Sequence, residues 1–175
     1  MTRKYEDIKE DVLKDVAEFM CAAARTAPKT RGIDNLVIVI LDKAEREKVI
    51  AKMKEIAKRD SRPSCERDAG NIAGTGHIVV IGTKKIPVGL NCGFCGYPTC
   101  EELGKTKGVC AYNAMDLGIA LGSSAALASR FHIDNRLMFS IGKAAIELGL
   151  LGENIIQAIG VPLSATGKNP FFDRS

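Results

Sequence analysis

The chain has no tryptophan, and aromatic residues make up only 5% of its 175 residues. Proteins that bind single-stranded nucleic acid usually stack the bases on exposed aromatic rings, and the sequence offers few such rings. The formal net charge is only +4, and the basic residues are spread along the chain. A nucleic-acid-binding domain usually concentrates basic residues on one face, so the sequence predicts no nucleic-acid partner.

Long apolar runs are also missing. No segment approaches the roughly 18 apolar residues that a membrane-spanning helix requires. The most apolar stretch, 111–130, is interrupted early by Asn113 and Asp116. The first ten residues are rich in charge and lack the apolar centre of a signal peptide. We therefore expect a cytoplasmic protein with no membrane partner.

Phosphate-binding glycine motifs are absent, although two segments contain parts of them. Gly74-Thr-Gly76 precedes a predicted strand, whereas a dinucleotide-binding motif lies between a strand and a helix. Gly104-Lys-Thr106 has the end of a phosphate loop, but Thr99 takes the position of its first glycine. Neither segment therefore predicts a nucleotide site.

Cysteine is the residue type that stands out. Four of the six cysteines lie between Cys92 and Cys110, in the pattern C-x2-C-x4-C-x9-C. In a reducing compartment, clustered thiols are more typical of metal or redox sites than of structural disulfides. We interpret Cys21 as a buried apolar residue of a helix, and we assign Cys65 no role in the cluster.

The spacing of the four cysteines favours one class of metal centre over the others. Thiolates are soft ligands that bind zinc, copper(I) and iron–sulfur clusters. Zinc sites usually combine two C-x2-C pairs across a long spacer, and this segment has only one such pair. We predict that Cys92, Cys95, Cys100 and Cys110 bind a [4Fe–4S] cluster, with zinc, free thiols or a disulfide as alternatives.

Glycine and proline shape the same segment. Gly93 and Gly96 leave the backbone bare beside the first two thiols, so their N–H groups are candidates for hydrogen bonds to cluster sulfur. Pro98 stands where a short helix is expected to begin, which places Cys100 near its N-terminus. Gly108 is expected to end that helix before Cys110 returns to the site.

The rest of the chain predicts a single α+β domain over residues 1–175, with 91–110 as a metal loop within it. Hydrophobic periodicity predicts helices over 5–25, 42–58, 111–130 and 137–151. Apolar runs predict strands over 36–41, 77–82 and 155–159, the first of them buried and central. We expect a loop over 59–76 and an irregular tail from residue 160 onward.

A basic loop follows the first predicted helix. Arg25, Lys29 and Arg31 concentrate positive charge beside the hydroxyls of Thr26 and Thr30. Such a loop is either a seat for an anion such as a phosphate or a solvated surface loop, and its composition does not separate the two.

The segment Cys92-Gly-Phe-Cys-Gly-Tyr-Pro-Thr-Cys100 closely resembles a known [4Fe–4S] module. That module occurs in the large subunit of the corrinoid iron–sulfur protein and in the B subunit of Rnf electron-transport complexes. The resemblance implies three ligands in this segment, while Cys110 lies closer than the module's usual fourth cysteine. The whole chain, including 134–142 and 168–174, is similar to a family of prokaryotic proteins described as containing a ferredoxin domain.

A further resemblance is to the nitroreductase fold. It rests on Ala22-Ala-Ala-Arg-Thr-Ala-Pro28 before a strand, on 116–120, and on Ile159-Gly-Val-Pro162. It implies a mainly antiparallel central sheet flanked by helices, with the cysteine-rich loop as an insertion, and a homodimer with FMN at its interface. It also implies that the flavin phosphate would be held by Arg25, Lys29, Thr30 and Lys168. The fold's early Arg-x-Ser-x-Arg clamp and its Gln-Pro-Trp segment are absent.

These patterns support three hypotheses of function. The first is an iron–sulfur protein that exchanges electrons with FMN on the same scaffold or with an external redox partner protein, as an oxidoreductase or as a carrier. The second is a binding or scaffold protein in which zinc or a cluster is a structural knot. The third is a flavin-binding or substrate-binding dimer without a redox metal.

Overall fold

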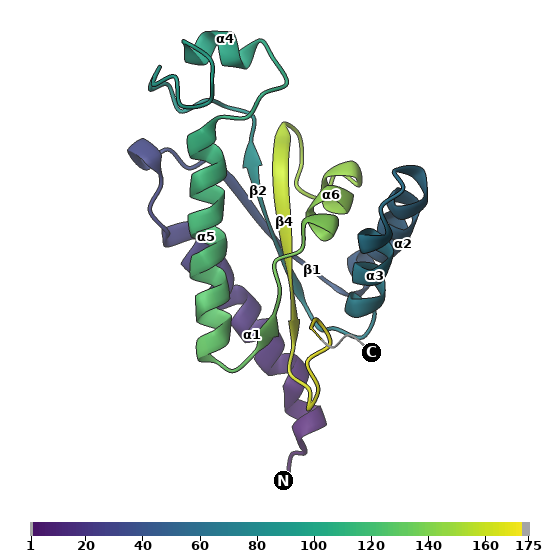
Figure 1. The fold of residues 1–175 in the computed structure, drawn as a ribbon. Helices are drawn as coiled ribbons and strands as arrows, with labels where there is room; N and C mark the ends of the chain where they lie inside the picture. The colour runs from purple at the N-terminus through teal and green to yellow at the C-terminus, as the bar shows by residue number, and fades with distance from the viewer. Residues whose placement is uncertain (1, 173–175) are drawn as a thin grey trace.

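The structure is a computed structural model that describes residues 2–172. It contains a four-stranded antiparallel sheet of strand order β1-β2-β4-β3, with helices on both faces (Figure 1). The helical elements are α1 (Tyr5–Thr26), η1 (Thr30–Gly32), α2 (Lys43–Arg59), α3 (Pro63–Ile72), α4 (Cys100–Gly104), α5 (Ala111–Arg130) and α6 (Phe139–Glu147). The strands are β1 (Leu36–Leu41), β2 (Ile78–Lys84), β3 (Asp134–Asn135) and β4 (Ile155–Ser164). The prediction of an α+β protein with an antiparallel sheet flanked by helices is confirmed.

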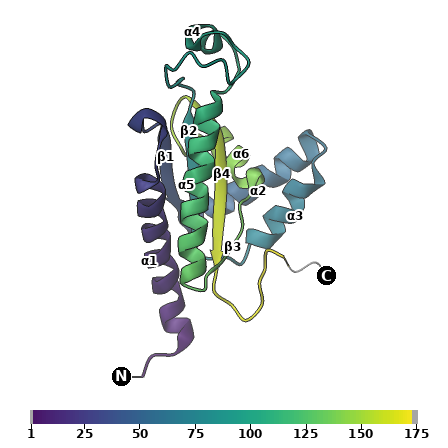
Figure 2. The same ribbon diagram turned by 60° about the vertical axis from the view of Figure 1, so that its left-hand side comes forward.

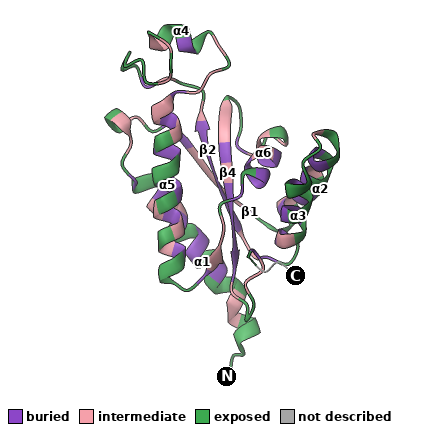
Figure 3. Cartoon of the chain, in the orientation of Figure 1, coloured by how far each residue is buried: buried purple, intermediate pink, exposed green. Residues whose placement is uncertain are grey.

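Strand β2 organises the core because its two faces pack against different helices. Val79 and Ile81 face α1 and α5, which lie side by side (Figure 2). Ile78 and Val80 face the opposite layer, which consists of α2, α3 and α6. Successive side chains of a strand point to opposite faces, so a strand covered on both faces needs the continuous apolar run that β2 has. Figure 3 accordingly shows β2 almost entirely buried.

The prediction that residues 36–41 form the central strand is wrong. These residues form β1 with the predicted bounds, but β1 lies at the edge of the sheet, and only Leu36 and Leu41 are buried. The central positions belong to β2 and β4. A run of β-branched residues indicates a strand that is covered on both faces, and helices cover β1 as well as β2. The apolar pattern alone therefore could not distinguish an edge strand from a central one.

Two segments without predicted structure are regular. Residues 63–72 of the expected loop form α3, which begins with Pro63 at its first position, where a missing N–H has no consequence. Its buried face includes Cys65, Asp68 and Ile72. The strand expected to end at residue 159 continues to Ser164, because pairing with β2 carries it through Pro162. The helix expected over 137–151 is shorter and spans α6.

The segment between β2 and α5 extends beyond one end of the sheet and carries the short helix α4 (Figure 1). It leaves the scaffold at Lys84 and rejoins it at Ala111, so both of its anchors are in the main body of the fold. Within residues 2–172, no helix is both long and apolar enough to cross a membrane. Of the stretch 168–174, the last two residues lie outside the part of the chain that the structure describes.

Candidate metal centre

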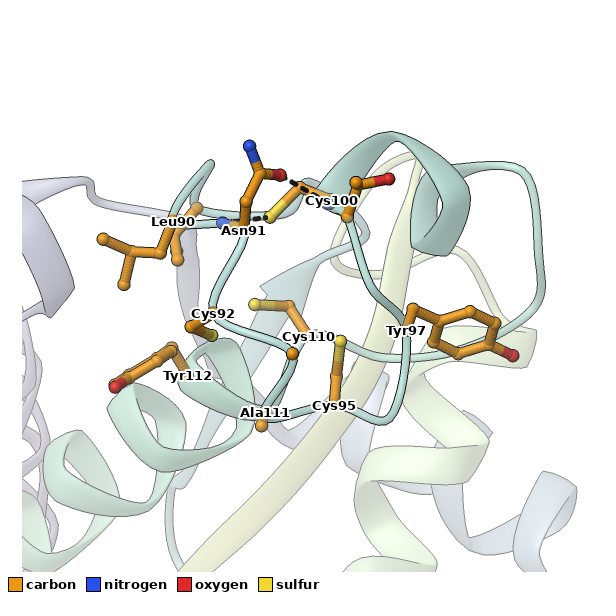
Figure 4. Close-up of a pocket in the computed structure, with 12 residues that line it drawn as sticks. Leu90, Asn91, Cys92, Cys95, Tyr97, Cys100, Cys110, Ala111 and Tyr112 are labelled. Carbon is orange, nitrogen blue, oxygen red and sulfur yellow. Dashed lines mark hydrogen bonds between the residues drawn. The ribbon is translucent and has the colours of Figure 1, made fainter.

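The four clustered cysteines line one cavity in the segment between β2 and α5. Cys92 is exposed, Cys95 and Cys100 are half-buried, and Cys110 is buried. Figure 4 shows the sulfur atoms of all four arranged around the space that the loop encloses. The structure therefore brings together the four predicted ligands, although they span nineteen residues of sequence.

The arrangement of these thiols bears on which metal group fits the cavity. Within residues 2–172, no three His, Cys, Asp or Glu side chains are grouped so that they could hold one metal ion. Zinc–thiolate bonds are about 2.3 Å long, so four sulfurs on one zinc ion must lie within about 4 Å of one another. In a [4Fe–4S] cluster each thiolate binds a different iron, and the sulfurs stay farther apart. Four thiols around a shared space are a donor set that suits either group, and it is their spacing along the sequence that favours a cluster.

Left-handed backbone turns make the loop compact. Gly93 and Gly96 have φ angles of 71° and 85°, which glycine adopts without the steric penalty of other residues. The Gly96 N–H donates to the Gly93 carbonyl at 2.9 Å, closing a tight turn around Cys95. This turn brings Cys92 and Cys95 to the same cavity.

The helix that carries Cys100 begins later and ends earlier than the sequence indicates. Thr99, not Pro98, is its N-cap, and the Thr99 hydroxyl accepts from the Glu102 N–H at 3.2 Å. Cys100 is the first residue of α4, which ends at Gly104. The Asn91 side chain also holds the Cys100 backbone, a contact across nine residues that the sequence did not reveal.

A small hydrophobic cluster of its own supports the loop. Val88, Leu103 and Cys110 are buried together, with Cys95 and Tyr112 packed against them. This cluster is separate from the two larger cores on the faces of the sheet. The loop therefore has a local core that includes two of the four thiols, and its position depends on its attachment to the scaffold.

Side chains that sequence reasoning did not select provide that attachment. Asn113, buried in the first turn of α5, donates to the carbonyls of Lys84 (3.1 Å) and Ile86 (2.8 Å). Asn35 donates to the same Ile86 carbonyl and to the Asn113 side chain. Arg31, in η1, donates to the Val88 carbonyl at 3.0 Å. No short motif could have identified these residues, because their partners lie 27 to 78 positions away.

Arg25, Lys29 and Thr30, which were predicted to hold a flavin phosphate, lie at the end of α1 and just after it, where they contact other groups of the chain. Arg25 pairs with Asp34, and the Lys29 amine donates to the carbonyls at the end of α1. The Thr30 N–H and hydroxyl both donate to the Asp116 carboxylate, at 3.1 and 2.9 Å. Partial burial opposes ionisation of Asp34, but the hydrogen bonds from Arg25 and from the Leu36 N–H outweigh it and lower its pKa.

The fourth of these residues, Lys168, lies at the other end of the sheet. Arg25, Lys29 and Thr30 precede Leu36, which pairs with Thr83 near the end of β2 that leads to the cysteine loop. Lys168 follows the end of β4, which pairs with the beginning of β2 (Figure 1). Within one chain, the structure therefore brings three of the four predicted residues together and leaves Lys168 apart.

The remaining cysteines lie away from the cavity. Cys65 is buried in α3, where burial and then the nearby Asp68 carboxylate raise its thiol pKa. Cys21 is only half-buried in α1, and burial is again the main reason that its pKa is raised. A raised pKa disfavours the thiolate that ligates metals, which agrees with the interpretation that neither residue belongs to the metal site.

Comparison with known sequences confirms the resemblance of the chain to the family described as containing a ferredoxin domain. The model of the family described as "uncharacterized protein containing a ferredoxin domain (DUF2148)" matches residues 106–174, which include Cys110. An uncharacterized protein of Archaeoglobus fulgidus is 41% identical over 179 residues, which cover 97% of this chain and 96% of that protein.

Comparison with solved structures identifies the scaffold. A nitroreductase with bound FMN from Desulfitobacterium hafniense superposes with a TM-score of 0.61 at 17% identity, over 91% of this chain and 82% of that one. A nitroreductase family protein from Clostridium difficile gives a TM-score of 0.59 at 14% identity, over 90% and 74% of the two chains. At such identities the likeness shows the fold alone, and the prediction of a nitroreductase-like fold is confirmed.

Proposed function

Because this chain belongs to the family of ferredoxin-domain-containing proteins, we propose that it is an iron–sulfur redox protein. Cys92, Cys95, Cys100 and Cys110 hold a [4Fe–4S] cluster in the cavity beyond the end of the sheet. The observation that carries the proposal is the convergence of these four thiols on one cavity, in a segment that resembles a known cluster module.

The chain's own residues have distinct tasks in this proposal. The cluster, when bound, supplies reversible one-electron chemistry. The four thiolates ligate it. The buried side chains of Val88 and Leu103 keep water from the Cys110 thiolate. Cys92 is exposed, so one ligand lies at the surface, where an external redox partner protein can approach.

A structural metal knot is the alternative that must be separated from this proposal. Zinc in the loop would tie 92–110 to the scaffold and add its binding free energy to folding. The spacing of the cysteines argues against it, because zinc sites usually combine two C-x2-C pairs and this segment has only one. We therefore rank redox chemistry above a zinc knot.

Coupling to FMN is the less supported part of the proposal. It is supported by the nitroreductase-like fold and by the FMN in one of the structures that share it. A flavin phosphate bound by Arg25 and Thr30 would have to compete with Asp34 and Asp116. The loop thiols are therefore the primary redox site, and FMN is a second cofactor to be assayed on the same sample.

We also propose a homodimer, as the nitroreductase resemblance implies. Its support in this chain is an exposed apolar surface on α5 and α1. Met115 and Ile119 are 41% and 44% exposed and lie one helical turn apart on α5. The exposed rings of Phe19 and Phe131 stack on each other, with their centroids 6.1 Å apart. Sedimentation analysis should show a dimer for the wild type and a monomer for Ile119→Lys, and a monomeric wild type would contradict this part.

All six cysteines are free and four of them line one cavity, which agrees with a reducing compartment. We therefore keep the cytoplasm as the proposed location.

The experiment that tests the proposed function is anaerobic reduction monitored by visible absorption. Protein purified without oxygen should be brown, its absorption should bleach on addition of dithionite, and a one-electron acceptor should restore it. A variant with serine at Cys92, Cys95, Cys100 and Cys110 should be colourless, whereas the Cys21→Ser/Cys65→Ser control should behave like the wild type. Wild-type protein without reducible colour would contradict the proposal.

A further inference from the structure

Asn91 contacts Cys100 with both its backbone and its side chain. The Asn91 backbone N–H donates to the Cys100 sulfur at 3.4 Å, and the Asn91 side-chain oxygen accepts from the Cys100 backbone N–H at 2.8 Å (Figure 4). The two bonds join Asn91, at the start of the cysteine loop, to Cys100, the first residue of α4. Among residues 2–172, Cys100 is the one candidate ligand whose sulfur accepts a hydrogen bond from a backbone N–H.

The backbone of Asn91 explains how both contacts form at once. Its φ angle is 48°, in the left-handed region that asparagine occupies more readily than most residues. This turn directs the N–H toward the Cys100 sulfur, while the short amide side chain reaches the Cys100 N–H. Alanine would lack the acceptor and would strain the backbone, whereas glycine would accept the backbone but still lack the acceptor.

We propose that Asn91 is a positioning residue that fixes Cys100 as a cluster ligand and raises the reduction potential of the cluster. This inference rests on the proposed function. Reduction adds negative charge to the cluster and its thiolates, and an N–H group directed at a ligand sulfur stabilises that charge. Loss of the N–H···S bond therefore disfavours the reduced state and makes the potential more negative.

The side chain acts through the backbone contact. The bond from the Cys100 N–H to the Asn91 side chain holds the turn in which the Asn91 N–H meets the sulfur. Removal of the side-chain oxygen frees both ends of the segment and lets Cys100 leave the cluster more easily. Because this also loosens the N–H···S bond to the charged thiolate, iron release to a chelator should be about tenfold faster.

The test compares the reconstituted wild type with Asn91→Ala and Asn91→Gly. Iron and sulfide are quantified first, then the midpoint potential is measured by a redox titration, and iron release to a chelator is timed. Both variants should have a more negative potential and faster iron release than the wild type. The shift should be larger for Asn91→Ala, because glycine keeps the left-handed turn.

Asn154→Ala is the matched control. Asn154 also has a left-handed φ angle, of 60°, but it lies in the turn before β4. In Asn154→Ala, the midpoint potential of the cluster and the rate of iron release should equal those of the wild type, even if the melting temperature of the variant falls. Wild-type values in both Asn91 variants that carry a full cluster would overturn the inference and leave the proposed function intact. Wild-type protein without iron and sulfide would overturn both.

Discussion

At the scale of single residues, Cys110 decides whether the ligand set is complete. It is buried at the N-cap of α5. Its spacing from Cys100 in the sequence is shorter than the spacing usual before the fourth cysteine of the resembled module. Its thiol lines the same cavity as the other three. The part of the chain that matches the family model includes Cys110 and begins after the other ligands.

Replacing Cys110 with serine should remove the fourth ligand. Iron and sulfide bound after anaerobic reconstitution should fall. The affinity for the cluster should drop by at least about tenfold, since changes to residues that only hydrogen-bond to a metal ligand already have effects of that size. Cys65→Ser is the control, because Cys65 is at least as buried but lies in α3. Equal iron and sulfide in Cys110→Ser and the wild type would exclude Cys110 as a ligand.

At the residue scale, sequence reasoning can group residues whose side-chain type carries their chemistry. Four cysteines could be grouped by their spacing, and the structure places them around one cavity. The residues that hold the loop could not be found this way, because Asn113 and Arg31 act through backbone carbonyls that a fold brings to them. In the basic loop, Arg25 and Thr30 have carboxylate partners 9 and 86 positions away, which the composition of the loop did not indicate.

At the scale of elements, the contact between α6 and β4 is unusually close. A Cβ atom added to Gly142 would lie 1.8 Å from the Ala158 carbonyl oxygen, and one added to Gly160 would collide with the Ile141 side chain. Met138 and Gly160 form a bridge at the same crossing. The glycines allow the first turn of α6 to rest directly on β4.

Gly142→Ala should therefore destabilise the fold severely. The methyl group would meet backbone atoms that cannot rotate away, and overpacking of this kind typically costs about 1–3 kcal/mol or more. Gly70→Ala is the matched control, since nothing lies within 4 Å of an added Cβ in α3, and it should raise stability by about 0.5–1 kcal/mol. Urea unfolding of the two variants measures both effects, and equal stabilities would refute the close contact.

Boundaries of elements followed from sequence where periodicity was strong. The apolar stripe of α1 and the run of β1 were located to within a residue, whereas α3 was missed. Pro63 and the glycines around α3 read as loop signals, although Pro63 starts the helix and Ala69 and Ile72 bury one face of it. Local breakers are ambiguous when packing against a neighbouring helix, here α2, decides the outcome.

At the scale of the whole molecule, an ion-pair network ties α2 to α6 across one layer. Arg59 bonds to Asp60 and Glu147, and Lys143 bonds to the same two carboxylates. The hydrogen bond from Arg59 lowers the pKa of Asp60 and of Glu147 below their ordinary values, with Lys143 contributing. The network is solvent-exposed enough to be weakened by salt.

This network predicts a loss of stability at acid pH. Carboxylates with a lowered pKa in the folded state are protonated first in the unfolded state, so their stabilisation is complete above about pH 5 and is lost as the pH falls below about 4. The melting temperature of the wild type should therefore fall more between pH 5 and pH 3 than that of Glu147→Gln, which has the same cysteine loop. Parallel curves for the two proteins, or a difference that persists in 1 M NaCl, would contradict this reading.

The molecule consists of a scaffold, made of the sheet and its helices, and a cysteine loop between β2 and α5. The sheet and its two helical layers are those of the nitroreductase fold, while the cysteine loop, in which we propose the redox centre, extends beyond the end of β2 (Figure 1). The scaffold anchors the loop through Asn35 and Asn113, so its position is a property of the fold and not of the loop alone. The central claim is that this loop holds an iron–sulfur cluster.

One measurement tests that claim most directly: the amounts of iron, acid-labile sulfide, zinc and flavin in a single sample of wild-type protein purified without oxygen. The ligand set predicts about four iron and about four sulfide per chain, with no stoichiometric zinc. One zinc per chain without iron, or a sample with neither metal, would contradict the claim.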